Sequence, residues 1–323
     1  MVVATENLER SGLMSGSDQA YVVGQIQPAL EEITISEFFA RTVSRYPDRE
    51  ACIFCQSGER WTWSQLSQKV DQLAAGLLAL GVYKGDRVGI WSPNKPEWVL
   101  AQFATARIGA ILVNINPAYR RAELKYALVK VGVKVLITAG SFKTSNYLEM
   151  LNDLIPELAT CRPERLSSPE FPLLRSIIQI GVASHSGMFC FQEIIEKGTT
   201  AYLARVDGIS RKLFPDESIN LQFTSGTTGA PKAATLTHKN IVNNARFVAE
   251  SMQLTQKDKL CIPVPLYHCF GMVLGNLACV AEGTTMVFPG EGFDPVDTLE
   301  ALNEERCTGV HGVPTMFSAM LNC

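Results

Sequence analysis

Apolar and polar residues follow two different periods along this chain, and the two periods alternate from about residue 35 onward. A helical period of apolar residues predicts helices over residues 35–46, 64–80, 96–108 and about 121–131. Short apolar runs bounded by turn residues predict strands at 51–54, 60–63, 87–91, 110–114, 135–138 and 177–180. This alternation is typical of βαβ units, in which helices cover both faces of a mostly parallel sheet.

Turn and capping residues indicate where these elements begin and end. Gln56-Ser57-Gly58 separates two short strands and predicts a hairpin. We expect Pro47 to end the first helix, Ser64 to cap the second and Gly81 to end it. Residues 157–175 hold several prolines and charges without a period, which predicts a surface loop between two lobes.

The segment Thr224–Lys232 combines glycines, hydroxyls and one lysine in a single turn. It reads Thr-Ser-Gly-Thr-Thr-Gly-Ala-Pro-Lys and lies between two strand-like runs, 219–223 and 233–237. Gly226 and Gly229 allow positive φ and a close approach of the backbone to a ligand. The side chains that can donate to phosphate oxygens are Thr224, Ser225, Thr227, Thr228 and Lys232. The pattern predicts a polyphosphate-binding loop that is not of the Walker A type, and the alternative is a flexible linker.

Four further segments accompany this loop, and together they resemble a known family. The loop resembles the phosphate-binding signature of the adenylate-forming superfamily, which includes acyl-CoA synthetases, firefly luciferases and the adenylation domains of peptide synthetases. The other segments follow in the family's order at residues 61–66, 106–117, 265–271 and 312–317. The resemblance covers about residues 35–323 and is nearest in character to medium- and long-chain fatty acyl-CoA synthetases.

The resemblance implies an α/β fold for residues 31–323, with stacked, mostly parallel β-sheets and helices between and outside them (αβαβα). We expect lobes over about residues 80–210 and over about 31–75 plus 215–323, and a disordered N-terminal tail over 1–30. The family's Tyr-Gly-x-Thr-Glu element, its Thr-Gly-Asp motif and its small C-terminal domain do not occur in the sequence. We therefore expect a truncated N-terminal AMP-binding domain that alone completes neither half of the family's reaction.

In that reaction, ATP and a fatty acid give acyl-adenylate and pyrophosphate, and CoA then displaces AMP to give acyl-CoA. The resemblance implies ATP, Mg²⁺ and CoA as ligands, with Thr224–Lys232 on the ATP phosphates. Thr224 matches the family position whose hydroxyl helps to bind Mg²⁺. Ala233 replaces the family's usual glycine, which would cost about 1 kcal/mol at a positive φ and almost nothing in an extended strand.

The aromatic turn at residues 267–271 resembles the segment near the family's acyl pocket. The residues implied for the substrate are Tyr267, His268, Phe270 and Gly271, with His311 as a further candidate. His268 is the candidate catalytic residue, and the alternative is a structural histidine bonded to the backbone. Amino-acid-activating relatives carry an acidic residue here and this chain does not, so an uncharged acyl chain fits better than an ammonium group.

Two other functions stay open at the level of sequence. The first is a catalytically silent acyl- or nucleotide-binding remnant. The phosphate loop favours the ligase over this remnant, because a remnant does not need such a loop. The second is a luciferase-like oxygenase, which uses the same loop and would consume oxygen or emit light with a cyclic carboxylic acid.

Composition narrows the setting of the protein. The 323 residues are 46% hydrophobic and 19% charged with a net charge of −3, which favours neither nucleic acid nor an anionic membrane as a partner. The nine cysteines are scattered and odd in number, which indicates reduced thiols, and the Cys52–Cys55 pair reads as a buried strand. No secretory signal or transmembrane segment is predicted. We expect a cytoplasmic protein, with mitochondrial or peroxisomal locations as alternatives, and place His238 at the surface or in a helix cap formed by Thr237.

Overall fold

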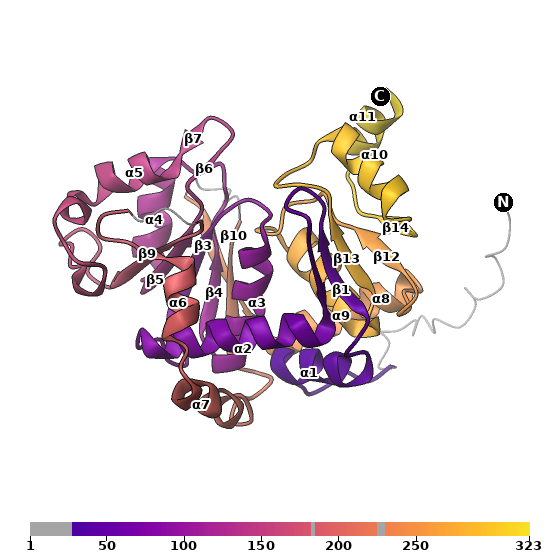
Figure 1. Cartoon of the computed structure of the whole chain (residues 1–323), viewed down its shortest axis with the longest axis horizontal. Helices are drawn as coiled ribbons and strands as arrows, with labels where there is room; N and C mark the ends of the chain where they lie inside the picture. The colour runs from indigo at the N-terminus through magenta and orange to yellow at the C-terminus, as the bar shows by residue number, and fades with distance from the viewer. Residues whose placement is uncertain (1–27, 182–184, 225–229) are drawn as a thin grey trace, which may run out of the picture. The chain divides into compact units, whose positions relative to one another are not determined.

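Two β-sheets form the framework of residues 31–323, with helices between them and on both outer sides (Figure 1). The computed structural model describes residues 28–181, 185–224 and 230–323. The expected N-terminal tail therefore lies almost entirely outside the described residues.

The larger sheet has, within the described residues, seven strands in the order β11-β10-β4-β3-β5-β8-β9. Neighbouring strands are parallel, except that β10 and β11 form an antiparallel hairpin. Every residue of β5 is buried, as expected of a parallel strand covered on both faces. The strands are β3 (Arg87–Trp91), β4 (Ile111–Asn114), β5 (Val135–Thr138), β8 (Ser176–Gln179), β9 (Phe189–Cys190), β10 (Ser218–Thr224) and β11 (Lys232–Thr237).

The smaller sheet has the order β14-β12-β13-β1-β2. Its pairs are parallel except for β1 and β2, which form the hairpin predicted around Gly58, where φ is 73°. The strands are β1 (Glu50–Phe54), β2 (Glu59–Thr62), β12 (Lys259–Cys261), β13 (Thr285–Phe288) and β14 (Gly309–Val310), and a separate ribbon pairs β6 (Ser141–Phe142) with β7 (Ser145–Asn146).

The helices agree with the predicted ones, with one correction at an N-terminus. The helix α2 is capped by Thr62 and not by Ser64. The amide of Gln65 donates to Thr62 Oγ1 (3.2 Å), and the amide of Thr62 donates to Gln65 Oε1 (2.9 Å). This reciprocal capping box satisfies two amides that would otherwise lack partners. The helices are α1 (Ile35–Arg45), α2 (Trp63–Ala79), α3 (Pro96–Ile108), α4 (Arg121–Val131), α5 (Tyr147–Leu154), α6 (Phe191–Lys197), α7 (Thr200–Ser210), α8 (His238–Ser251), α9 (Ala278–Glu282), α10 (Pro295–Glu304) and α11 (Pro314–Leu321), with 3-10 turns η1 (Pro156–Ala159) and η2 (Pro163–Arg165) and a π-helix η3 (Phe270–Leu277).

The apolar core shows how the layers stack. One continuous cluster joins Val88 of the larger sheet and Phe54 of the smaller sheet through the helices between them, among them α2 and α3. The helices α4 and α5 cover the outer face of the larger sheet through Leu124 and Leu151. The helix α10 covers the smaller sheet through Ala301. These five layers confirm the αβαβα fold that the family resemblance implies.

Two boundaries differ from the sequence prediction. The hairpin of β10 and β11 extends the larger sheet, because β10 pairs with β4 in parallel. Residues 218–237 therefore belong with the larger sheet and not with the second lobe, where they were expected. The loop predicted over residues 157–175 contains the short helical turns η1 and η2 at its start.

The position of His238 also corrects the sequence prediction. Thr237 caps α8 as predicted, since its Oγ1 accepts from the amide of Asn240 (3.2 Å). His238 itself is fully buried, and its Nδ1 accepts a hydrogen bond from the amide of Ile35 (3.1 Å). Its partner lies 203 residues earlier in the chain, so no local pattern could reveal the contact.

Candidate functional site

The β10–β11 hairpin carries the two ends of the predicted phosphate loop. Strand β10 ends at Thr224 and β11 begins at Lys232, and these residues face each other across the hairpin. Both side chains are exposed, and Thr224 Oγ1 lies 3.5 Å from the carbonyl oxygen of Lys232. Ser225, Gly226, Thr227, Thr228 and Gly229 lie outside the described residues. The hairpin places the loop ends at the carboxyl edge of the larger sheet, where open α/β sheets bind ligands.

The unusual Ala233 fits the hairpin without strain. It lies in β11 opposite Phe223, and its φ is not positive. The extended backbone accepts alanine as readily as glycine, so replacing the family's usual glycine costs almost nothing at this position.

The aromatic turn is held by its own backbone. The amide of His268 donates to the carbonyl of Pro265 (3.2 Å), and the amides of Gly271 and Met272 donate to the carbonyl of His268 (3.1 and 3.0 Å). His268 is exposed, and its Nδ1 accepts from the amide of Phe270 (3.1 Å). An accepting Nδ1 assigns the ring proton of the neutral imidazole to Nε2. The turn thus leaves Nε2–H available as a donor.

A cleft of about 580 Å³ lies between the hairpin and this turn. Thr224, Tyr267 and His268, all predicted site residues, line it together. Burial raises the pKa of Tyr267 and of Tyr119, so both phenols stay protonated at neutral pH. The described residues that line it have an apolar and aromatic majority and include no carboxylate: Asn116, Tyr119, Gln222, Phe223, Thr224, Pro231, Ala234, Leu236, Tyr267, His268 and Cys269.

Among the predicted residues that the structure describes, four do not line this cleft: Lys232, Phe270, Gly271 and His311. The rings of Phe270 and His311 pack against each other with centroids 4.9 Å apart. His311 is nearly buried, and its Nε2 donates to the carbonyl of Leu274 (2.8 Å). Burial lowers the pKa of His311, which keeps the ring neutral. His311 therefore holds the π-helix η3 in place, and Gly271 serves the backbone of the turn.

Several cleft residues carry no signal in the sequence. Tyr119 follows the segment 106–117, and its ring meets the ring of Phe223 edge-on at a centroid distance of 6.5 Å. Gln222 is nearly buried in β10, and it reaches the cleft only because β10 ends there. No periodic pattern marks such residues, because their role depends on which strands become neighbours.

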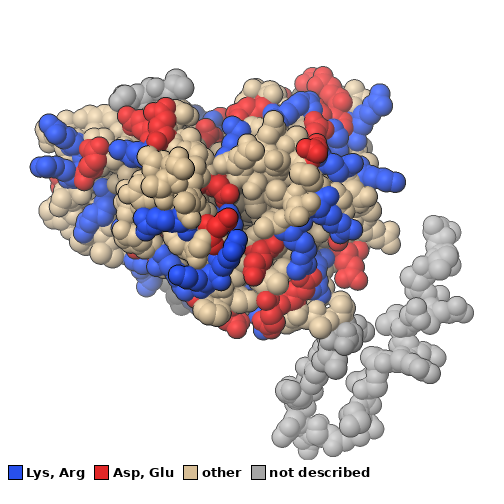
Figure 2. Space-filling view, turned by 60° about the horizontal axis from the view of Figure 1, so that its bottom comes forward, with Lys and Arg blue, Asp and Glu red and all other residues tan. Residues whose placement is uncertain are grey.

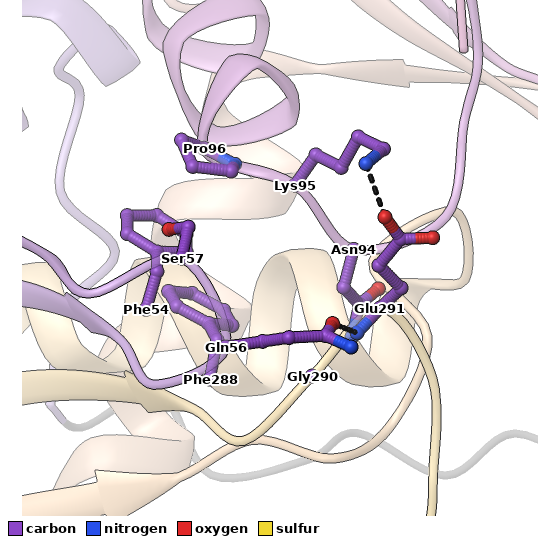
Figure 3. Close-up of a pocket in the computed structure, with 9 residues that line it drawn as sticks. All are labelled: Phe54, Gln56, Ser57, Asn94, Lys95, Pro96, Phe288, Gly290 and Glu291. Atoms are coloured by element: carbon purple, nitrogen blue, oxygen red, sulfur yellow. Dashed lines mark hydrogen bonds and ion pairs between the residues drawn. The ribbon is translucent and has the colours of Figure 1, made fainter. Parts of the chain in front are cut away.

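Other surfaces offer less chemistry. On the face shown in Figure 2, Lys and Arg side chains are interspersed with Asp and Glu, unlike the continuous basic surface of a nucleic-acid-binding protein. No helix of the described residues is long and apolar enough to cross a membrane. A smaller cavity of about 220 Å³ lies near the start of α3, beside the ion pair of Lys95 and Glu291 (Figure 3).

The chain thus folds as an α/β domain with a cleft beside the hairpin at the carboxyl edge of its larger sheet. The chain belongs to the AMP-binding enzyme family, whose model matches residues 39–323.

Curated relatives are acyl-CoA ligases. The chain is 43% identical over 304 residues to the mitochondrial medium-chain acyl-CoA ligase ACSF2 of Danio rerio, covering 94% of this chain and 50% of that protein. It is 43% identical over 305 residues to the acyl-CoA ligase SID4 of Ajellomyces capsulatus, with the same two coverages of 94% and 50%. The chain thus spans about half the length of the curated relatives it matches.

Solved structures agree on the fold. The long-chain-fatty-acid-CoA ligase FadD1 of Archaeoglobus fulgidus superimposes with a TM-score of 0.76 at 22% identity, covering 94% of this chain and 56% of that one. The anthranilate CoA ligase AuaEII, solved in complex with anthranoyl-AMP, gives a TM-score of 0.75 at 22% identity, with coverages of 90% and 52%.

Proposed function

We propose that this chain carries the phosphate-binding and acyl-binding part of an ATP-dependent ligase for medium- or long-chain fatty acids. The product of the whole reaction is acyl-CoA, formed through an acyl-adenylate. The observation that carries this proposal is the cleft that Thr224 and His268 line together, because it puts the end of the phosphate loop opposite the aromatic turn.

The hairpin supplies the phosphate-binding part. Lys232 is exposed at the start of β11 and brings a positive charge to the departing pyrophosphate, while the hydroxyl of Thr224 offers an oxygen ligand for Mg²⁺. No group of three His, Cys, Asp or Glu residues suited to a metal occurs in the described part of the chain. This donor set fits Mg²⁺, which commonly takes its ligands from substrate phosphates and water with few from protein. Catalysis of this kind depends on positioning and on charge stabilisation.

The aromatic turn supplies the acyl-binding part. Tyr119, Phe223 and Tyr267 provide apolar surface, and the absence of a carboxylate from the lining disfavours an amine substrate. The Nε2–H of His268 is a donor for the carboxylate of the fatty acid as it approaches the nucleotide. CoA is the proposed second substrate, and we keep the cytoplasm as the proposed compartment.

Binding of Mg·ATP to the 323-residue chain, measured by calorimetry, tests the nucleotide part. We expect Lys232→Gln to weaken binding about tenfold or more, because the variant loses a charge-assisted contact to phosphate. The matched control is Lys257→Gln, an exposed lysine at the other end of β12 from the turn, which should leave binding unchanged. Equal affinities in the wild type and in Lys232→Gln would contradict the proposal.

An activity assay separates the alternatives. We expect the isolated chain to form no CoA thioester from a fatty acid, since the relatives are about twice its length. Robust fatty-acid-dependent thioester formation would contradict that expectation. Binding of Mg·ATP without any turnover, even in an extended form of the protein, would favour the silent remnant, and light emission or oxygen consumption would favour the oxygenase.

A further inference from the structure

Two buried asparagines of the larger sheet hold the main chain of the segment that leads into the His268 turn. Asn94 follows β3, and Asn114 is the last residue of β4; their side chains are 6% and 2% exposed. The segment that they hold, residues 264–267, follows β12 of the smaller sheet. The contacts therefore join the two sheets next to the His268 turn, and neither asparagine lines the cleft.

Asn94 binds this segment as a neighbouring strand would. Its Nδ2 donates to the carbonyl of Val264 (3.0 Å), and its Oδ1 accepts from the amide of Leu266 (2.8 Å). Its own amide donates to the carbonyl of Glu291 (3.0 Å), so its backbone is fixed to the loop after β13. Figure 3 shows Asn94 and Glu291 beside each other. Because the Asn94 side chain is buried and makes two hydrogen bonds, only one orientation of its amide group satisfies both partners.

Asn114 binds the carbonyl of Tyr267, and a third asparagine, Asn220, orients the Asn114 side chain. Its Nδ2 donates to the carbonyl of Tyr267 (2.9 Å). The Nδ2 of Asn220 donates to Asn114 Oδ1 (2.9 Å), which fixes the direction of the Asn114 amide. Asn220 lies in β10, the strand that ends at Thr224. A continuous chain of hydrogen bonds thus runs from the phosphate-binding hairpin to the backbone next to His268.

We propose that Asn94 and Asn114 are positioning residues that set the place of His268 relative to Thr224. The inference rests on the proposed function, in which these two residues serve one ligand. A relative shift of the two sheets would leave buried carbonyl and amide groups without partners, which is unfavourable in an apolar interior. The asparagines therefore keep the two walls of the cleft in register without touching the ligand.

Hydrogen exchange of the whole 323-residue chain tests the positioning directly. The variants are Asn94→Leu and Asn114→Leu, because leucine keeps the approximate shape and removes both hydrogen-bonding functions. We expect exchange of the amides in residues 264–272 to rise about tenfold in each variant, with strand β5 unchanged. The matched control is Asn243→Leu. The side chain of Asn243, in α8, also makes two hydrogen bonds to main-chain atoms, namely the amide and the carbonyl of Glu31. This control variant should raise exchange near residue 31 and leave the turn unchanged.

Two results would overturn the proposal. One is unchanged exchange at residues 264–272 in both variants, and the other is the same acceleration throughout the chain. If Asn94→Leu does not fold, Asn94→Ser replaces it in the exchange experiment. If Asn114→Leu does not fold, Asn220→Ala replaces it, because this variant removes the hydrogen bond that orients Asn114 and leaves Asn114 itself in place.

A binding measurement then connects positioning with the site. We expect Asn94→Leu and Asn114→Leu to weaken binding of a non-hydrolysable acyl-adenylate analogue about tenfold, with Asn243→Leu unchanged. If the wild-type chain does not bind the analogue, the proposed function fails, and the exchange experiment still decides whether the asparagines fix the turn. Full affinity in both variants would show that the turn's position does not matter for the ligand.

Discussion

At the scale of single residues, the turn that carries His268 depends on glycine at residue 271. A Cβ on this residue would lie 2.5 Å from the carbonyl oxygen of Pro265 and 2.9 Å from the Cα of Leu266. Both are backbone atoms, which cannot move away as the end of a flexible side chain could. Close approach of the backbone, and not positive φ, is therefore the reason for glycine here.

We predict that Gly271→Ala lowers the free energy of unfolding by about 1–3 kcal/mol, as overpacking of a tight interior does. Urea titration measures this change. Gly208→Ala in α7 is the matched control, because nothing lies within 4 Å of a Cβ there. Alanine should stabilise that helix by about 0.5–1 kcal/mol. Equal effects of the two substitutions would contradict the role of close approach.

His238 makes the stability of the fold depend on pH. Burial lowers its pKa to about 4, against an ordinary value of 6.5. The unfolded chain therefore binds the proton more readily, and stability falls as pH drops from about 6.5 towards 4. The loss is on the order of 3 kcal/mol once both states are protonated.

We predict that His238→Asn flattens the rise of the free energy of unfolding between pH 4 and 6.5. Asparagine still offers an oxygen to the amide of Ile35, so the structural contact has a replacement. The measurement is denaturant unfolding at a series of pH values. A wild-type slope that persists in the variant would assign the pH dependence to other groups.

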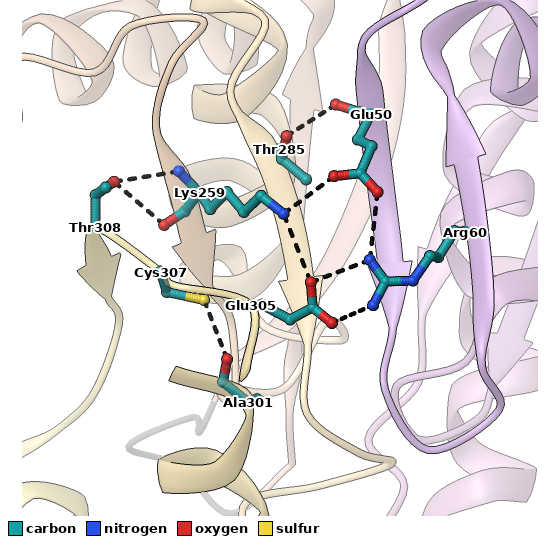
Figure 4. A network of polar contacts seen from close by, with 8 residues as sticks. All are labelled: Glu50, Arg60, Lys259, Thr285, Ala301, Glu305, Cys307 and Thr308. Carbon is teal, nitrogen blue, oxygen red and sulfur yellow. Dashed lines mark hydrogen bonds and ion pairs between the residues drawn. The ribbon is translucent and has the colours of Figure 1, made fainter. Parts of the chain in front are cut away.

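At the scale of elements, a network of four charges ties the edge of the smaller sheet to the end of α10 (Figure 4). Arg60 of β2 pairs with Glu305 and with Glu50, and Lys259 of β12 pairs with the same two carboxylates. Hydrogen bonds from Arg60 are the first cause that lowers the pKa of Glu305. The network joins strands β1, β2 and β12 to Glu305, the residue that follows α10. Ion pairs within one element would not connect these parts of the fold.

We predict a coupling energy of about 1 kcal/mol or less between Arg60 and Glu305 in a double-mutant cycle of alanine variants, because Arg60 is half exposed. The coupling should shrink with added salt and as pH falls through the lowered pKa of Glu305. The exposed pair of Arg41 and Glu31 is the reference and should couple more weakly. A coupling that ignores salt would show that packing, and not charge, joins these residues.

At the scale of the whole molecule, local sequence patterns predict the helices and strands, whereas the neighbours of each strand depend on pairing between residues far apart in the chain. The alternation of helix and strand predicts a mostly parallel sheet with helices on both faces, and the family resemblance implies the five layers. The assignment of β10 and β11 to the larger sheet depends on the pairing of Asn220 with Leu112, which lies 108 positions away. The burial of His238 and the contacts of Asn94 and Asn114 with residues 264–267 also depend on residues far apart in the chain.

The candidate site divides in the same way. Motifs that are contiguous in the sequence predict Thr224, Lys232 and the aromatic turn, and of these residues Thr224, Tyr267 and His268 line the cleft. Tyr119 follows β4 and Gln222 lies in β10, so both line the cleft because these two strands are neighbours, whereas His311 does not line it and bonds to the carbonyl of Leu274. Chemistry carried by one segment is readable from sequence, whereas chemistry assembled from several segments needs the fold.

The proposed function requires that the hairpin and the aromatic turn bind one ligand, and a calorimetric double-mutant cycle with a non-hydrolysable acyl-adenylate analogue measures whether they do. The variants are Thr224→Val, which removes only the hydroxyl, and His268→Ala, each alone and combined in the 323-residue chain. We predict that each single variant weakens binding about tenfold, equivalent to about 1.4 kcal/mol. We also predict that the effects in the double variant are not additive, since both residues line one cleft. Unchanged affinity in either single variant would show that the hairpin and the turn do not bind the same ligand.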